Sequence, residues 1–222
     1  MNMIVSMCKL TPLFIAILWQ LPVLRLVLSL FSLVQFYVVA RLTQPWLMGS
    51  SVEWAGRLRL PAFLLSVLLV LWLGRDGLRR PQRPRHLRWG VALTAVTLAL
   101  TYVAIFVLRL WVPSLPTLWD IALFLVTGLL AEEFWFRGAL FSLWQRGHSE
   151  RVAVVITAIL FGLSHWQYHG FGFTLAAGVQ IGYTVLLGLV FGVLRGQTRS
   201  VWAAVGLHLV VNLIATIAIQ SA

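Results

Sequence analysis

Two glutamates and an arginine interrupt an otherwise apolar stretch of the sequence, as Glu132, Glu133 and Arg137. Charged groups at membrane depth are costly unless partners or water compensate them, so a functional site is the default hypothesis for such a stretch. On a helix, Glu133 and Arg137 lie one turn apart on the same face and can neutralise each other. Glu132 lies about 100° further round the helix. The spacing therefore predicts a structural ion pair between Glu133 and Arg137, and leaves Glu132 for chemistry.

Three further polar side chains stand in apolar stretches later in the chain. His208 and Asn212 are one helical turn apart and point in the same direction, and His165 comes from a different predicted helix. Taken alone, each has an ordinary structural explanation. A histidine can lie in the core with its ring hydrogen-bonded, and an asparagine amide can hydrogen-bond between two helices. We expect the carboxylate, the two imidazoles and the amide, which come from separate helices, to converge on one site. His169 follows His165 at helical spacing, but it adjoins a glycine-rich connection and is a minor candidate.

The composition indicates helices that span a membrane. The chain has 222 residues, of which 60% are hydrophobic and 10% charged, and its mean hydropathy is +0.92. Too little polar surface is available to cover a soluble globule. The net charge of +11 comes from arginines between apolar runs, which favours membrane topology over binding to nucleic acid. Cys8 is the single cysteine, so an intrachain disulfide and a cysteine-ligated metal are excluded.

The apolar runs predict an all-α fold, a polytopic bundle of seven transmembrane helices. The predicted spans cover residues 11–40, 60–73, 89–110, 118–145, 151–166, 174–194 and 201–219. The first run is long enough for two spans, which would make eight, but we favour one helix kinked at Pro22. The loop at 74–88 carries six arginines against one aspartate, so we expect it in the cytoplasm. This orientation places the N-terminus inside and the C-terminus outside an integral protein of the cytoplasmic (inner) membrane.

Local signals mark some helix ends and contacts. Thr117 to Asp120 resembles a capping box at the start of the fourth span. Gly178, Gly182, Gly188 and Gly192 recur at spacings that favour close approach of a neighbouring helix. At about 1.5 Å per residue, the site residues lie at different depths, and convergence of the three helices requires tilt or later helix starts.

The polar residues fall into three short motifs. Glu132 to Arg137 reads EExxxR, Phe161 to His165 reads FxxxH, and His208 to Asn212 reads HxxxN. Together and in this order they resemble the CPBP intramembrane endopeptidases, also called the ABI or CAAX-protease-like family, which includes the Rce1 prenyl-protein proteases. The resemblance covers about half the chain, roughly 117–216. It implies a catalytic membrane core at 112–222 behind an N-terminal transmembrane region at 1–111.

The resemblance also implies roles for these residues. Glu132 would be the general base, assisted by His165, while His208 and Asn212 would donate to the oxyanion of a tetrahedral intermediate. Glu133 and Arg137 would support the motif helix. In a second mechanism, Glu132, His165 and His208 would hold a catalytic zinc ion. We favour the metal-free mechanism, because once Glu132 is a ligand and Glu133 is paired, no second carboxylate is evident as the base.

The implied activity is hydrolysis of a peptide bond in a membrane-associated protein or peptide, within a lipid bilayer and without a nucleic-acid partner. Two rival readings come from other classes. A proton-coupled transporter also places Glu, His and Arg in membrane helices. A non-catalytic scaffold or immunity protein could retain the fold of a protease. Neither the identity of the substrate nor the oligomeric state follows from the sequence.

Overall fold

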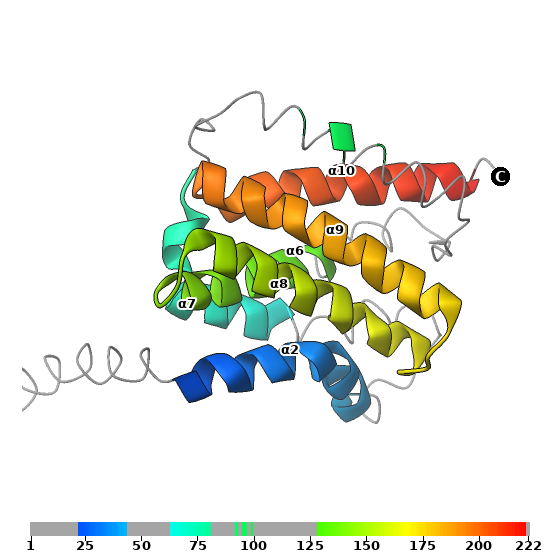
Figure 1. Cartoon of the computed structure of the whole chain (residues 1–222), viewed down its shortest axis with the longest axis horizontal. Helices are drawn as coiled ribbons and strands as arrows, with labels where there is room; N and C mark the ends of the chain where they lie inside the picture. Colours follow the sequence, from blue (N-terminus) through cyan, green and yellow to red (C-terminus); the bar gives the residue numbers. More distant parts are fainter. Residues whose placement is uncertain are drawn as a thin grey trace, which may run out of the picture.

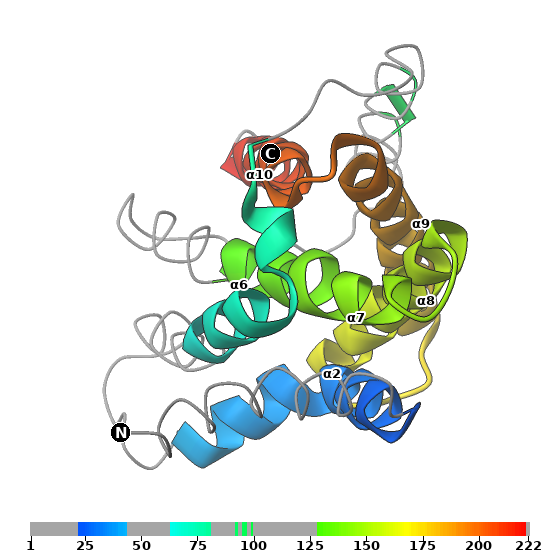
Figure 2. The same cartoon turned by 90° about the vertical axis from the view of Figure 1, so that its left-hand side faces the viewer.

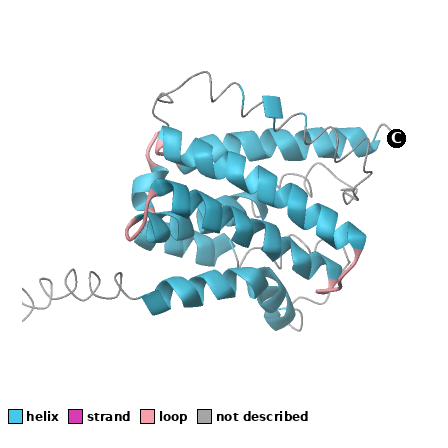
Figure 3. Ribbon diagram, in the orientation of Figure 1, coloured by secondary structure: helices cyan, strands magenta, loops and turns pink. Residues whose placement is uncertain are grey.

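A computed structural model describes residues 22–43, 63–80 and 128–220, together with isolated helical positions at 92, 95–96 and 99. Every regular element in these ranges is helical, and none of them is a strand (Figures 1 and 3). The elements are α2 (Pro22–Thr43), a helix at Phe63–Leu73, η2 (Arg75–Leu78), α6 (Leu130–Glu133), η5 (Phe134–Leu140), α7 (Phe141–Gln145), α8 (Glu150–Ser164), η6 (His165–His169), α9 (Leu175–Thr198) and α10 (Val201–Gln220). The all-α prediction is confirmed.

The predicted number of spans is not decided by the described residues. Within them, one helix, α9, is both long and apolar enough to cross a membrane, whereas Phe63–Leu73 and the described part of α10 are shorter apolar helices. The span at 89–110 and the capping box at Thr117 lie outside the described ranges, apart from single positions. The count of seven or eight spans therefore stays a prediction. α2 begins at Pro22, where a proline is well accommodated as the first helical residue.

Helices α8 and α9 run antiparallel against each other (Figure 1). Ser149 caps the start of α8 by accepting a hydrogen bond from the Val152 amide, and Thr174 caps α9 in the same way. Of the four glycines predicted to pack closely, all of them in α9, Gly188 lies against the backbone of Ala158 and Gly192 against Val154. The prediction of close helix approach is confirmed at these two positions.

At the other two predicted positions, Gly178 and Gly182, no described residue packs closely. A Cβ added at Gly178 or Gly182 would meet no described atom within 4 Å. The α8–α9 contact is close at Gly188 and Gly192 of α9, and also where Gly162 of α8 lies against Ile181 and Val185. Sequence spacing alone does not show how far along a helix its partner extends.

The predicted span at 118–145 is not a regular α-helix in its described part. The chain passes from α6 through a π-helical segment, η5, into α7, and every residue of η5 is buried. This α6–η5–α7 segment lies inside the bundle, between α2 and α10 in Figure 2. Gly138 in η5 lies against Val70, and the Gly138 carbonyl leaves no room for a side chain at Gly74. The helix that carries the glutamates is thus packed on several sides.

The described part of the arginine-rich loop, residues 74–80, is bound to one end of the bundle. The Arg146 guanidinium donates to the Leu73 carbonyl at 3.0 Å, and the Trp202 indole donates to the Leu78 carbonyl at 2.9 Å. The hydroxyl of Ser200 donates to the Arg79 carbonyl at 2.6 Å. These contacts bring the end of α7 and the start of α10 together beside η2.

Candidate active site

Glu133 and Arg137 form the ion pair that their spacing predicts. Glu133 Oε1 lies 3.4 Å from Arg137 Nη1, and both side chains are fully buried. The guanidinium carbon of Arg137 lies 4.2 Å from the ring centroid of Phe161 and 5.2 Å from that of Phe191. Arg137 Nη2 also donates to the Gly188 carbonyl at 3.4 Å. Two aromatic faces and one carboxylate therefore compensate a cation that has no access to water.

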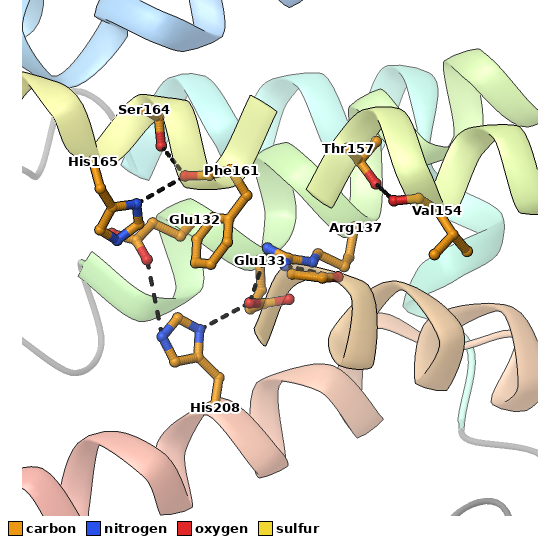
Figure 4. A network of polar contacts seen from close by, with 10 residues as sticks. Glu132, Glu133, Arg137, Val154, Thr157, Phe161, Ser164, His165 and His208 are labelled. Carbon is orange, nitrogen blue, oxygen red and sulfur yellow. Dashed lines mark hydrogen bonds and ion pairs between the residues drawn. The ribbon is translucent and has the colours of Figure 1, made fainter. Parts of the chain in front are cut away.

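His208 lies between the two glutamates (Figure 4). Its Nδ1 is 2.8 Å from Glu133 Oε1, and its Nε2 is 4.0 Å from Glu132 Oε2. The ring stacks on Phe191 at 4.9 Å between centroids. A carboxylate accepts hydrogen bonds, so the short contact requires a proton on Nδ1. Nε2 is then the nitrogen that faces Glu132.

The contact between Glu133 and His208 was missed by the sequence analysis, which gave Glu133 only Arg137 as its partner. Glu133 accepts a hydrogen bond from His208 and forms an ion pair with Arg137, so it orients an imidazole in addition to neutralising the arginine. No local spacing could have found this bond, because the two residues are 75 positions apart. Glu133 and His208 are in contact although counting residues along their predicted helices places them at different depths.

His165 lies just beyond α8, as the first residue of the short helix η6. The predicted span ran on to Trp166, whereas the α-helix ends at Ser164. His165 Nδ1 is 2.8 Å from the Phe161 carbonyl, and because a carbonyl only accepts, this nitrogen carries the proton. In the neutral ring Nε2 then has the free lone pair. In Figure 4 the His165 ring lies beside the Glu132 side chain.

The remaining sequence candidates are less central. Asn212 lies one turn after His208 on α10 and is half-buried, so it shares the helix face that carries the imidazole. His169 ends η6 and lies 2.6 Å from the side-chain oxygen of Gln180 on α9, which gives it a partner away from the glutamates. The contacts described above join the two glutamates, Arg137 and His208 in one buried cluster, with His165 beside it.

The three residues of the zinc mechanism are not gathered into a metal site among the described residues. Among the residues that the structure describes, no three His, Cys, Asp or Glu side chains form a group that could hold a metal ion. His208 Nε2 lies 4.0 Å from Glu132 Oε2, a separation that two ligand atoms could just span if each lay about 2.0–2.2 Å from one zinc ion. The other nitrogen of His208 is bonded to Glu133. The site as it stands is an ion-pair and hydrogen-bond network.

Comparison with known proteins gives one finding. The family model of the type II CAAX prenyl endopeptidases, Rce1-like, matches residues 113–214. All six polar residues of the three motifs lie inside this range, and the resemblance noted from the motifs is confirmed. No curated protein and no solved structure matches the chain. Members of this family are membrane proteins and proteases, and through residues 113–214 the chain is similar to the type II CAAX prenyl endopeptidase Rce1-like family.

Proposed function

We propose that this protein is an intramembrane endopeptidase that cleaves a peptide bond in a membrane-associated protein or peptide. The observation that carries the proposal is the position of His208, with one ring nitrogen bonded to Glu133 and the other facing Glu132. Peptide hydrolysis needs a base for water and donors for an oxyanion, and such groups act most strongly in a buried site. The side chain of Glu132 is 13% exposed, whereas that of Glu133 is fully buried, which favours Glu132 as the group that meets water.

In the mechanism that we infer, Glu132 takes a proton from a water molecule that attacks the carbonyl carbon of the substrate. His165 accepts a hydrogen bond from the same water through Nε2, because its Nδ1 proton is held by the Phe161 carbonyl. The attack forms a tetrahedral intermediate, and its original peptide carbon–nitrogen bond breaks when Glu132 passes its proton to the leaving amine. Glu132 thus returns to its starting state without a metal ion or a second base.

His208 and Asn212 would stabilise the oxyanion from α10. To donate from Nε2 while Nδ1 stays bonded to Glu133, His208 must carry both ring protons. The cluster then holds two carboxylates, one guanidinium and one imidazolium, and it is electrically neutral. The amide of Asn212, one turn further along the same helix, supplies a second donor of the kind used in oxyanion holes.

The decisive test is the Glu132→Gln variant, which keeps the size of the side chain and removes the base. We expect cleavage to fall by about 10²- to 10⁴-fold. The first substrate is a prenylated peptide with a CAAX terminus, and the second readout is a proteomic comparison of peptide termini in membranes with wild type or variant. Asp76→Asn, in the exposed ion pair with Arg79, is the control and should cleave normally. Unchanged termini in Glu132→Gln membranes, with the protein inserted, would falsify the proposal.

A chelation experiment separates the two mechanisms of the same protease. For the metal-free mechanism we expect purified protein to contain well below one zinc per chain and to keep its activity after treatment with phenanthroline. Loss of activity on chelation, followed by recovery when zinc is added, would replace the glutamate mechanism with the zinc mechanism. Solute transport by reconstituted protein that cleaves no peptide would instead support the transporter reading.

A further inference from the structure

The motif helix is irregular next to the site. At the end of η5 the amide of Phe141 donates to the carbonyls of Phe136 and Gly138. In a regular α-helix it would instead donate to the carbonyl of Arg137, four residues earlier. A π-helical turn frequently marks a functional site. The Arg137 carbonyl is buried, and a buried carbonyl needs a donor from elsewhere.

Arg195, near the end of α9, supplies a donor to this carbonyl. Its Nε lies 3.1 Å from the Arg137 oxygen, and the bond joins residues 58 positions apart. Only 5% of the Arg195 surface is exposed. A charged donor bonded to a buried carbonyl is stronger than a neutral one, so this is a substantial tie between α9 and the motif helix.

The position of the Arg195 guanidinium is enclosed from two other sides. Its central carbon lies 5.1 Å from the ring centroid of Phe141, the residue whose amide passes over Arg137. On another side, a Cβ added at Gly77 of η2 would come within 2.7 Å of Arg195 Nη2. The absence of a side chain at Gly77 therefore leaves the space that the guanidinium occupies.

The direction of the glutamates depends on this turn. Successive residues of a helix are rotated by about 100°, so a change from π-helical to α-helical hydrogen bonding would rotate the residues before the turn relative to those after it. Glu132 and Glu133 directly precede η5. A rotation there would move the Glu133 carboxylate away from His208 Nδ1, to which it is now bonded at 2.8 Å.

We propose that Arg195 is a positioning residue, which holds the π-helical turn at Arg137 and thereby directs both motif glutamates toward His208. Its effect on catalysis rests on the proposed function, whereas its effect on the Glu133–His208 bond does not. No group of Arg195 touches the substrate. It acts on the reaction through the backbone of the helix that carries Glu132.

The test compares Arg195→Lys with Arg199→Lys. The two variants make the same substitution in neighbouring turns, but Arg199 is exposed at the C-terminal cap of α9. Lysine keeps the charge and loses the planar donor group. With purified protein labelled with ¹⁵N in its five histidines, the His208 signal is assigned by its loss in His208→Gln. We expect Arg195→Lys to shift this signal and Arg199→Lys to leave it unchanged.

His169 is the internal reference for this experiment. Its ring is bonded to Gln180, in the part of α9 distant from Arg195, so a local rearrangement leaves its signal in place. General loosening of the bundle would shift both histidine signals. In the peptidase assay we expect Arg195→Lys to lower kcat about tenfold and to change KM less than twofold, since small displacements of catalytic groups have effects of this order or larger.

Gly77→Ala perturbs the same contact from the opposite side without a change of charge. Its methyl group would displace the Arg195 guanidinium, so we expect the same direction of shift in the His208 signal. In the double variant the two effects should be smaller than their sum, because they act through one contact. If Arg195→Lys does not fold, Gly77→Ala alone decides the matter. An unshifted His208 signal in the folded variants overturns the inference, even if the protein is an active protease. If the wild type has no peptidase activity, the His208 signal still tests the role of Arg195.

Discussion

The imidazole of His208 contacts both glutamates of the motif, although neighbouring residues on a helix point about 100° apart. It can do so because its two nitrogens lie on opposite sides of the ring. The short bond goes to the fully buried Glu133 and the longer contact to the partly exposed Glu132. At the scale of single residues, the two glutamates carry the same chemical group and differ in their burial and in their contact with His208.

Substitution of each glutamate should separate stability from activity. Glu133→Gln leaves Arg137 fully buried without its carboxylate and weakens the bond to His208, so we expect the free energy of unfolding to fall by about 3 kcal/mol. Glu132→Gln should have a much smaller effect on stability, because Glu132 is partly exposed and its contact with His208 is long, at 4.0 Å. Thermal unfolding in one detergent measures both. Equal stability of the two variants would show that the Glu133–Arg137 pair does not brace the helix.

At the scale of elements, the α8–α9 interface determines where Arg137 and Phe161 meet. Gly188 has two functions there, since its missing side chain lets α9 approach Ala158 and its carbonyl accepts from Arg137. Gly162 on α8 likewise leaves room for Val185 of α9. The close contact places the rings of both Phe161 and Phe191 next to the guanidinium.

Two matched glycine substitutions in α9 test this packing. A Cβ at Gly188 would lie 2.9 Å from the Ala158 Cα, so we expect Gly188→Ala to destabilise the protein by about 1–3 kcal/mol through overpacking. Gly182→Ala meets no described atom within 4 Å and should be neutral, or stabilising by up to about 1 kcal/mol through helix propensity. The measurement is unfolding in detergent, and a larger loss at Gly182 than at Gly188 would contradict the packing described here.

At the scale of the whole molecule, the ends of several helices meet beside η2, and arginines are frequent there. Arg79 and Arg146 come from different loops, and Arg79 forms an exposed ion pair with Asp76 at 2.9 Å. The turn between η6 and α9, at the opposite end of α9, carries the exposed Phe173 instead. This asymmetry agrees with the cytoplasmic position expected for the arginine-rich loop.

Cysteine labelling can test this orientation. In a Cys8→Ser background, cysteines are introduced one at a time at Arg79, where the side chain is 73% exposed, and at Phe173, which is 92% exposed. A membrane-impermeant thiol reagent should modify position 173 in intact cells, and position 79 only in inverted vesicles. The reverse pattern would show that the protein is inserted the other way round. Labelling of both positions from one side would exclude a membrane crossing between them.

The sequence alone determined the helical class, the membrane environment and the motif residues, because hydropathy and helical spacing are local properties of the chain. It also predicted the Glu133–Arg137 pair, whose members lie one turn apart. The tertiary structure decided that His208 bonds to Glu133, that Gly188 and not Gly182 is in close contact, and that Arg195 reaches the Arg137 carbonyl. These contacts depend on how the helices are placed against one another and on a π-helical turn, and neither leaves a periodic signal in the sequence.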